Sequence, residues 1–203
     1  METKTLNFGE TLRDAITIGI KNAPSVIAAV ALWLVTIWIP YLNVGTTIAI
    51  TLLPTQLAKG DIVNPLGIFD SKYRRYMGEY FITMGLMTFS TLVGVLFAFV
   101  PAIVISIAWT LSYYFLFEKG KNPIEAIKAS NEATYGSKWT IFFVVLSAII
   151  LFSFVFSIAM TICNMIDVAF ISFIVMFTIV VLTISISMAI SASFWKQLKD
   201  NVE

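Results

Sequence analysis

The sequence lacks histidine, has one cysteine and carries few charged residues. Of its 203 residues, 12% are charged and 59% are hydrophobic. Without histidine, the chain has neither the commonest metal ligand nor the side chain best suited to proton relay near neutral pH. Cys163 is alone, so no intramolecular disulfide can form, and we expect its thiol to pack as a small apolar group. The composition therefore predicts no metal site and no cofactor.

Catalytic motifs are missing as well. The sequence contains no Gly-x-Ser-x-Gly elbow, no Walker-type phosphate loop and no pair of carboxylates inside its apolar segments. A serine or threonine nucleophile would lack an obvious base. We therefore expect no catalytic residue and no enzymatic activity. The formal net charge of +1 gives too little basic excess to favour nucleic acid as a partner.

The sequence is rich in long apolar segments, and its charged residues lie between them. The mean hydropathy is +0.90. All 13 Lys and Arg residues fall in segments that one membrane topology places on a single side, whereas the other connections carry none. The positive-inside rule produces this distribution, so we expect a multi-pass protein with both termini in the cytoplasm. Asp167 is the one acid expected on the outer side, in a solvated turn.

The apolar segments predict an all-α fold: a single membrane domain over residues 1–203, with six transmembrane helices and two amphipathic cytoplasmic surface helices. The expected spans are residues 24–41, 44–58, 77–100, 101–117, 139–161 and 169–195. Trp139 and Trp195 are expected to mark the cytoplasmic ends of the last two spans, where amphipathic rings prefer to lie.

The two surface helices are expected at residues 7–21 and 122–135. In the first, apolar residues recur at helical spacing opposite charged ones. In the second, Asn122, Pro123 and Glu125 have the order of a helix start with a capping box. The first helix would lie either on the membrane surface or on the protein's own cytoplasmic face.

The second expected span contains the most unusual polar pattern. Thr47, Thr51 and Thr55 recur at four-residue intervals, and Gln56 follows. Pro54 removes a backbone hydrogen bond from a helix that is already short, so we predict a kink near residues 53–55. Hydroxyls and free carbonyls at membrane depth can line a cavity or bind an ion, and we expect the threonines to face the bundle interior. The alternative is that the hydroxyls bond to their own helix or hold a neighbouring one.

Two other groups of side chains are candidates for ligand binding. The fourth span offers a candidate pocket made by Ser106, Trp109, Thr110 and Tyr113. Simple packing with one satisfied hydrogen bond is the alternative use of such a tryptophan. The central cytoplasmic loop offers three basic side chains for anionic lipid headgroups: Lys72, Arg74 and Arg75. Setting the topology is the alternative use of these charges.

A stripe of small residues follows the last span. Ser185, Ala189 and Ser193 recur at four-residue intervals and permit close helix approach. Packing within the chain and assembly of a homo-oligomer are both open as uses of this stripe. The expected partners are therefore the lipid bilayer with its anionic lipids, a second copy of the chain and another membrane protein.

Several short motifs follow one another in a fixed order between residues 40 and 143. They are a Pro-x-x-x-Gly-like entry into a short span at residues 40–45, Ile68 with Phe69, a Tyr- and Arg-rich exit at 73–76, a Pro turn at 101–103, an aromatic run at 113–115, Asn122 with Pro123, Ala126, Ser130, and a Gly-x-Lys-Trp run at 136–139. In this order they resemble an uncharacterised family of bacterial multi-pass membrane proteins, related to the membrane domain fused to some glycerophosphodiester phosphodiesterases.

The resemblance implies a six-span layout and a location in the bacterial cytoplasmic (inner) membrane. Ala102 stands where family members usually carry glycine. The sequence contains no phosphodiesterase barrel, so the resemblance implies no hydrolase activity and supplies no catalytic residue.

Two functions are open at this point. The first is a transport or channel module that acts as an oligomer or with a partner, and it needs a solvated cavity lined by Thr47, Thr51 and Thr55. The alternative is a non-transporting accessory or scaffold protein that organises lipids or a membrane complex. That alternative needs only a dry bundle with an exposed surface.

Overall fold

A computed structural model describes residues 4–166 and 168–202, which form helices and no strand. The α-helices are α1 (Phe8–Thr36), α2 (Leu42–Thr51), α3 (Leu53–Leu57), α4 (Met77–Leu96), α5 (Val100–Ala108), α6 (Ser112–Glu118), α7 (Pro123–Ala133), α8 (Lys138–Ile166) and α9 (Ala169–Leu198). Two 3-10 helices, η1 (Pro65–Phe69) and η2 (Ser71–Tyr76), lie between α3 and α4. The all-α fold class is confirmed, and Asp167 lies outside the described residues.

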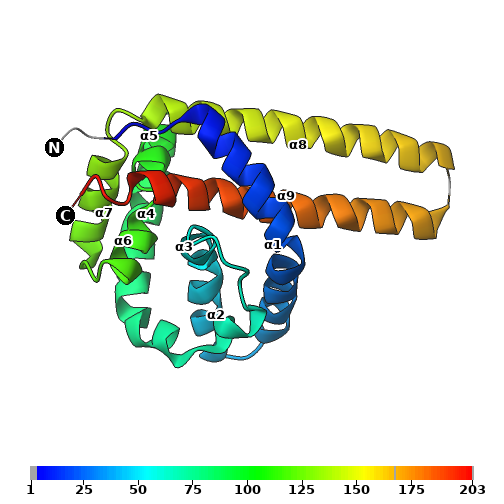
Figure 1. Ribbon diagram of the computed structural model, residues 1–203. Helices are drawn as coiled ribbons and strands as arrows, with labels where there is room; N and C mark the ends of the chain where they lie inside the picture. Colours follow the sequence, from blue (N-terminus) through cyan, green and yellow to red (C-terminus); the bar gives the residue numbers. More distant parts are fainter. Residues whose placement is uncertain (1–3, 167, 203) are drawn as a thin grey trace.

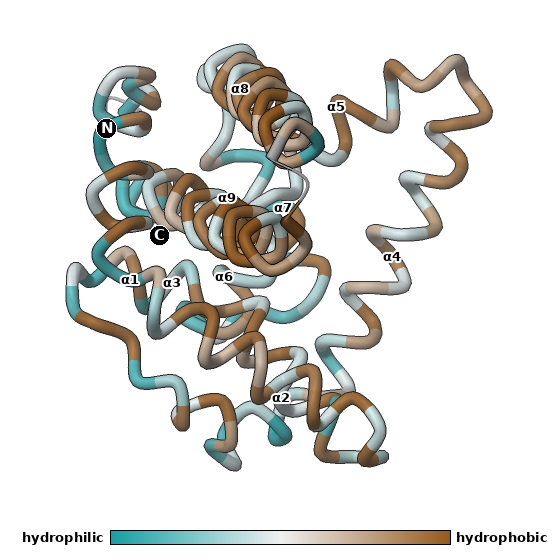
Figure 2. The backbone as a smooth tube through the Cα atoms, turned by 90° about the vertical axis from the view of Figure 1, so that its right-hand side faces the viewer, coloured by the Kyte–Doolittle hydropathy of each residue, from teal (hydrophilic) through white to brown (hydrophobic). Residues whose placement is uncertain are grey.

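Several helices have the length and composition of membrane spans. Within the described residues, five stretches are long and apolar enough to cross a membrane: Phe8–Thr36, Ser71–Leu96, Val100–Glu118, Lys138–Met165 and Ala169–Leu198. The outer portions of α8 and α9 are strongly hydrophobic (Figure 2), and their large apolar side chains are exposed. An apolar surface of this extent fits a lipid environment, as expected of an integral membrane protein.

The first surface helix is not a separate element. Residues 7–21 form the first half of α1, which runs without a break through Pro24. Asn7 caps the helix, and its side-chain oxygen accepts a hydrogen bond from the backbone N–H of Glu10 at 3.0 Å. The prediction of a helix boundary before Pro24 is therefore wrong. Packing of Ala15, Gly19 and Val26 inside the protein stabilises the continuous helix against the lost proline hydrogen bond.

The second surface helix is confirmed as α7. The predicted capping box is present, with Glu125 N donating to Asn122 Oδ1 at 2.9 Å and Asn122 N donating to Glu125 Oε2 at 3.3 Å. Ala126, Ala129 and Ala133 are buried, so the apolar side of α7 packs on the protein itself.

The expected second span is two short helices rather than one. It breaks at Leu52, where the backbone N–H bonds back to Ile48 and Ala49 before α3 begins. Pro54 lies in the first turn of α3, where its missing N–H removes no intrahelical hydrogen bond. The predicted kink is confirmed, one residue earlier than expected. A ten-residue α2 is only about 15 Å long, whereas the hydrocarbon core is roughly 30 Å thick.

The helices form three hairpins that share one base. The closed end of the α1–α2 hairpin and that of the α8–α9 hairpin point in different directions (Figure 1), and that of α4–α5 points in a third (Figure 2). The base contains the first half of α1, α3, α6, α7 and the last turns of α9. In one part of it, the N–H of Lys4 donates to Asn201 Oδ1 at 3.0 Å. In another, Lys21 Nζ donates to the carbonyl of Gly60 at 3.0 Å.

The last turns of α9 are the centre of this base. The side chains of Ser185, Ala189 and Ser193 are fully buried, and Ser185 Oγ donates to the carbonyl of Gly19 at 2.7 Å. Ser193 Oγ donates to Asp14 Oδ2 at 3.0 Å, also on α1. The small-residue stripe therefore packs within the chain and is not free to contact a second copy.

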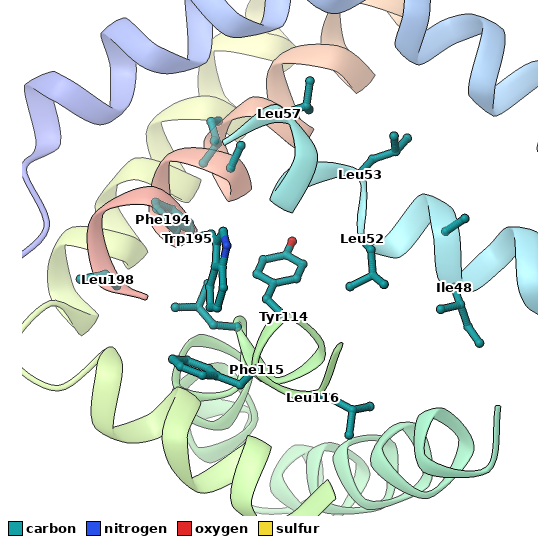
Figure 3. Close-up of a cluster of buried hydrophobic side chains, with 14 of the residues drawn as sticks. Ile48, Leu52, Leu53, Leu57, Tyr114, Phe115, Leu116, Phe194, Trp195 and Leu198 are labelled. Atoms are coloured by element: carbon teal, nitrogen blue, oxygen red, sulfur yellow. The ribbon is translucent and has the colours of Figure 1, made fainter. Parts of the chain in front are cut away.

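Aromatic packing joins α9 to α6 (Figure 3). The ring of Trp195 lies edge-on to Tyr114 and Phe115, with ring centroids 5.7 Å and 5.1 Å apart. Trp195 is buried, so its expected position at the membrane interface is wrong, whereas Trp139 is 74% exposed. The last turns of α9 are thus part of the protein core.

The close approach of α1 and α9 gives a stability prediction. A Cβ at Gly19 would lie 2.9 Å from the Cα of Ile186, so Gly19→Ala must push the two helices apart. We expect a loss of about 1–3 kcal/mol in unfolding free energy. Gly85→Ala in α4 is the matched control, because a Cβ there meets open space. Thermal unfolding in detergent, followed by circular dichroism, should show a lower midpoint for Gly19→Ala only. Equal midpoints for the two variants would contradict this packing.

Candidate functional site

A cavity of about 680 Å³ lies between the end of α3, the loop that carries η1 and η2, and the end of α6. Six charged side chains line it: Lys59, Lys72 and Arg75 are basic, and Asp61, Asp70 and Glu118 are acidic. The remaining lining includes Gln56, Asn64, Tyr73 and Tyr76. We call this cavity the charged pocket.

The loop that forms one wall of the charged pocket is fixed to α1. Asn22 is buried on α1, and its Oδ1 accepts a hydrogen bond from the backbone N–H of Val63 at 3.1 Å. Its Nδ2 donates to the carbonyl of Ile18 at 3.1 Å, so both ends of the buried amide are satisfied. This one side chain sets the path of the chain as it leaves α3.

The opposite walls are joined by hydrogen bonds across the break in the second span. Thr55 Oγ1 lies 2.9 Å from Glu118 Oε1 and also within bonding distance of the carbonyl of Leu52, at 2.8 Å. Gln56 Nε2 donates to the hydroxyl of Tyr73 at 2.8 Å. The helix break therefore places a threonine and a glutamine where they connect α3 to α6 and to η2.

Four of the six pocket charges form two pairs. Lys59 Nζ lies 3.7 Å from Glu118 Oε2, and Lys72 Nζ lies 3.2 Å from Asp70 Oδ2. Asp70 also caps η2, because its Oδ1 accepts a hydrogen bond from the backbone N–H of Lys72 at 2.9 Å. That N–H, followed by the Lys72 ammonium, lowers the pKa of Asp70 below its ordinary value. Asp70 is therefore a carboxylate at neutral pH.

Arg75 and Asp61 have no such partners. Neither side chain forms an ion pair or a hydrogen bond with any other residue that the structure describes, although both line the charged pocket. One free cation and one free anion are therefore presented to whatever occupies the cavity.

The same loop also exposes large apolar side chains. Ile62 and Leu66 are each 64% exposed, and Phe69 is exposed as well. Ile62 also lines the charged pocket, so apolar surface continues from the cavity to the exterior of the loop. A segment that offers charged side chains and exposed aliphatic side chains next to one another suits the boundary between headgroups and acyl chains.

The three predicted basic residues of this loop separate. Lys72 and Arg75 line the charged pocket, whereas Arg74 turns towards α2. The Arg74 guanidinium carbon lies 6.0 Å from the centre of the Tyr41 ring, and its aliphatic stem contacts Gly45. Arg74 therefore lies against the closed end of the α1–α2 hairpin, which the charge pattern had placed across the membrane.

The hydroxyls of the second span are used inside the protein. Thr47 Oγ1 accepts a hydrogen bond from Trp33 Nε1 at 2.9 Å, and Thr51 Oγ1 donates to the carbonyl of Thr47 at 3.0 Å. Thr46 and Thr36 are buried with their hydroxyl oxygens 2.8 Å apart. Of the predicted group, Gln56 alone lines the charged pocket.

The predicted group on the fourth span lies at a helix break, outside the charged pocket. The span breaks between α5 and α6, Ser106 is exposed, and Trp109 and Thr110 are half-buried. Tyr113 packs on Tyr80 with ring centroids 5.1 Å apart. None of these four predicted residues lines the charged pocket.

A serine from α7 compensates for this second helix break. Ser130 Oγ donates to the carbonyl of Ala108 at 2.8 Å and accepts a hydrogen bond from the N–H of Leu111 at 3.0 Å. Both backbone groups lose their normal helical partners at the break, and both are buried. One side chain therefore satisfies both ends of the interruption.

Sequence reasoning missed Lys59, Asp61, Asp70 and Glu118 as site residues. These charges belong to two segments far apart in the chain, and no local spacing connects them. The charge pattern predicted that both segments lie on the cytoplasmic side, but their meeting depends on the fold of α3 against α6. Comparisons with protein-family models, with curated proteins and with solved structures find no match for this chain.

Two buried serines give a stability prediction for the helix break between α5 and α6. Ser130→Ala removes both hydrogen bonds. It leaves the buried N–H of Leu111 unpaired and the carbonyl of Ala108 with only a 3.4 Å bond from Thr134 Oγ1, so we expect a loss of about 1–3 kcal/mol in unfolding free energy. Ser112 is equally buried, but its hydroxyl has no partner among the described residues. We expect Ser112→Ala to leave stability unchanged or to raise it. The same change at two buried positions thus has different outcomes, measurable by chemical unfolding in detergent. If Ser112→Ala lowered the unfolding free energy as much as Ser130→Ala, the role of Ser130 at the helix break would be refuted.

Proposed function

We propose that this chain is a multi-pass membrane accessory protein that organises lipids by holding a phospholipid headgroup in the charged pocket. The observation that carries the proposal is the continuity of the pocket with exposed apolar side chains. A headgroup needs charged partners, and its acyl chains need apolar surface. Arg75 supplies a free cation inside the cavity, and Ile62 and Leu66 extend the apolar surface outside it.

The charge chemistry of the pocket supports a phosphate-bearing ligand. Arginine binds phosphate through a fork of N–H donors, and Arg75 has no competing partner among the described residues. Lys72 lies in the same cavity, although Asp70 already neutralises it. Basic side chains next to a membrane surface each contribute on the order of 1 kcal/mol to lipid attraction.

The hydroxyl geometry favours this accessory role over transport. A polar path through the second span would require Thr47, Thr51 and Thr55 to offer free hydroxyls to water or an ion. In the structure, each hydroxyl already bonds to the protein. The accessory role, the alternative in the sequence reasoning, is thus the better supported of the two.

The proposed topology has four full crossings and one shallow hairpin. The crossings are α4, α5 with α6, α8 and α9. Lys21 bonds to Gly60, so the chain leaves the base along α1 and returns to it at the end of α3. Residues 21–36 rise only about 23 Å along the helix, less than the roughly 30 Å of hydrocarbon. A hairpin that lies along the cytoplasmic interface, rather than entering the hydrocarbon by its full length, keeps both termini in the cytoplasm. It also leaves every basic segment there, including Arg74 beside its closed end.

The shallow hairpin replaces the expected first and second spans. It explains how Arg74 can lie beside Tyr41 without crossing a bilayer. Irregular backbone at membrane depth is tolerated where protein covers it, as the break at Leu52 is covered. The α4–α5 and α8–α9 hairpins diverge from their base (Figure 2), so one bilayer requires tilt, which helices as long as α8 and α9 allow.

The location in the bacterial cytoplasmic membrane remains part of the proposal, because the family resemblance alone carries it. Self-association and a membrane-protein partner also remain predictions. The stripe on α9 does not serve as their contact, since it is buried within one chain.

Retention of lipid during purification tests the proposed function. We expect Arg75→Gln to lower the amount of phospholipid that stays bound in mild detergent by about fivefold, because an exposed charge contact contributes up to about 1 kcal/mol. Arg13→Gln is the matched control, since it removes the same charge from an exposed site on α1 outside the pocket. Native mass spectrometry of the full chain measures the bound lipid. Equal retention in both variants would contradict the proposal.

A further inference from the structure

We infer that the charged pocket selects a phosphoethanolamine headgroup, with its phosphate at Arg75 and its primary ammonium at Asp61. This inference rests on the proposed function and adds the class of headgroup.

The charges of the pocket are balanced before any ligand enters. Three basic and three acidic side chains line it, and two of each sign are paired with one another. An anionic headgroup without an amine would satisfy Arg75 and meet Asp61 as a like charge. A headgroup that carries one phosphate and one ammonium gives each free side chain a partner of opposite sign.

The aromatic lining favours a primary ammonium over a trimethylammonium group. Quaternary ammonium ions bind among open aromatic faces. Here Lys72 Nζ already lies 5.0 Å from the centre of the Tyr73 ring. Tyr76 and Phe117 pack edge to face on each other at 5.5 Å and 79°. A primary ammonium instead donates hydrogen bonds to a carboxylate, which Asp61 offers.

The same headgroup chemistry exists in a lipid and in the soluble compound phosphoethanolamine. The structure favours the lipid, because Ile62, at the cavity wall, and Leu66 beyond it are exposed. A soluble ligand has no use for this apolar surface, whereas acyl chains gain by covering it.

The experiment uses the full chain in mild detergent with an equimolar mixture of phosphatidylethanolamine, phosphatidylcholine and phosphatidylglycerol, read by native mass spectrometry. We expect phosphatidylethanolamine to be bound about two- to fivefold more than either competitor, the range for an ion pair that water can reach. Asp61→Asn should remove this preference by lowering bound phosphatidylethanolamine to the level of its competitors. Asp61→Lys should turn the preference towards phosphatidylglycerol, and Asp200→Asn is the control for loss of an exposed acid outside the pocket.

The variants distinguish lipid binding in general from selection of the phosphoethanolamine headgroup. If Arg75→Gln lowers binding of all lipids but Asp61→Asn leaves the preference intact, the phosphoethanolamine assignment is overturned and the lipid function stands. If Arg75→Gln has no effect, the proposed function fails with it. Soluble phosphoethanolamine is added in a final arm at the concentration of the lipid. No displacement supports a lipid ligand, and full displacement would overturn it in favour of a soluble compound.

Discussion

The buried amide of Gln197 is the interaction on which the rest of the structure depends. Its Oε1 accepts a hydrogen bond from the N–H of Asn7 at 2.9 Å, and its Nε2 donates to the hydroxyls of Thr11 and Ser193, both at 3.0 Å. A buried amide is costly unless its donors and acceptor are paired. This requirement fixes the register of α1 against α9, so that Gly19 meets Ile186 three turns further on. The two ends of the chain are thereby joined in one base.

The charged pocket follows from that base. With α1 fixed on α9, the buried Asn22 holds the loop at Val63, and Lys21 holds the end of α3 at Gly60. The core of α3, α6 and α9 in Figure 3 then brings Thr55 to Glu118. A site made from two segments far apart in the sequence therefore exists because helices outside those segments are locked together.

Local chemistry predicted several elements, and tertiary contacts decided the others. Pro54 predicted the helix break, and Asn122 with Glu125 predicted the start of α7. The missing proline N–H and the capping box both act within one helical turn. By contrast, Pro24 did not end α1, since packing on α9 outweighs a single lost hydrogen bond. Tryptophan is a residue type that favours the membrane interface, yet aromatic neighbours from α6 bury Trp195. The pocket was beyond sequence reasoning because Asp61 and Arg75 are brought together by the path of a loop without periodicity.

In the proposed topology all basic segments share one side of the membrane, and the first hairpin returns to that side. Single cysteines in a Cys163→Ala background, treated with a membrane-impermeant maleimide, test this most directly. A cysteine at Asn164 should be labelled in intact cells, and one at Lys121 only after permeabilisation. A cysteine at Ile39, at the closed end of the first hairpin, should resist labelling from outside. Labelling at Ile39 in intact cells as readily as at Asn164 would show a full crossing and contradict the account.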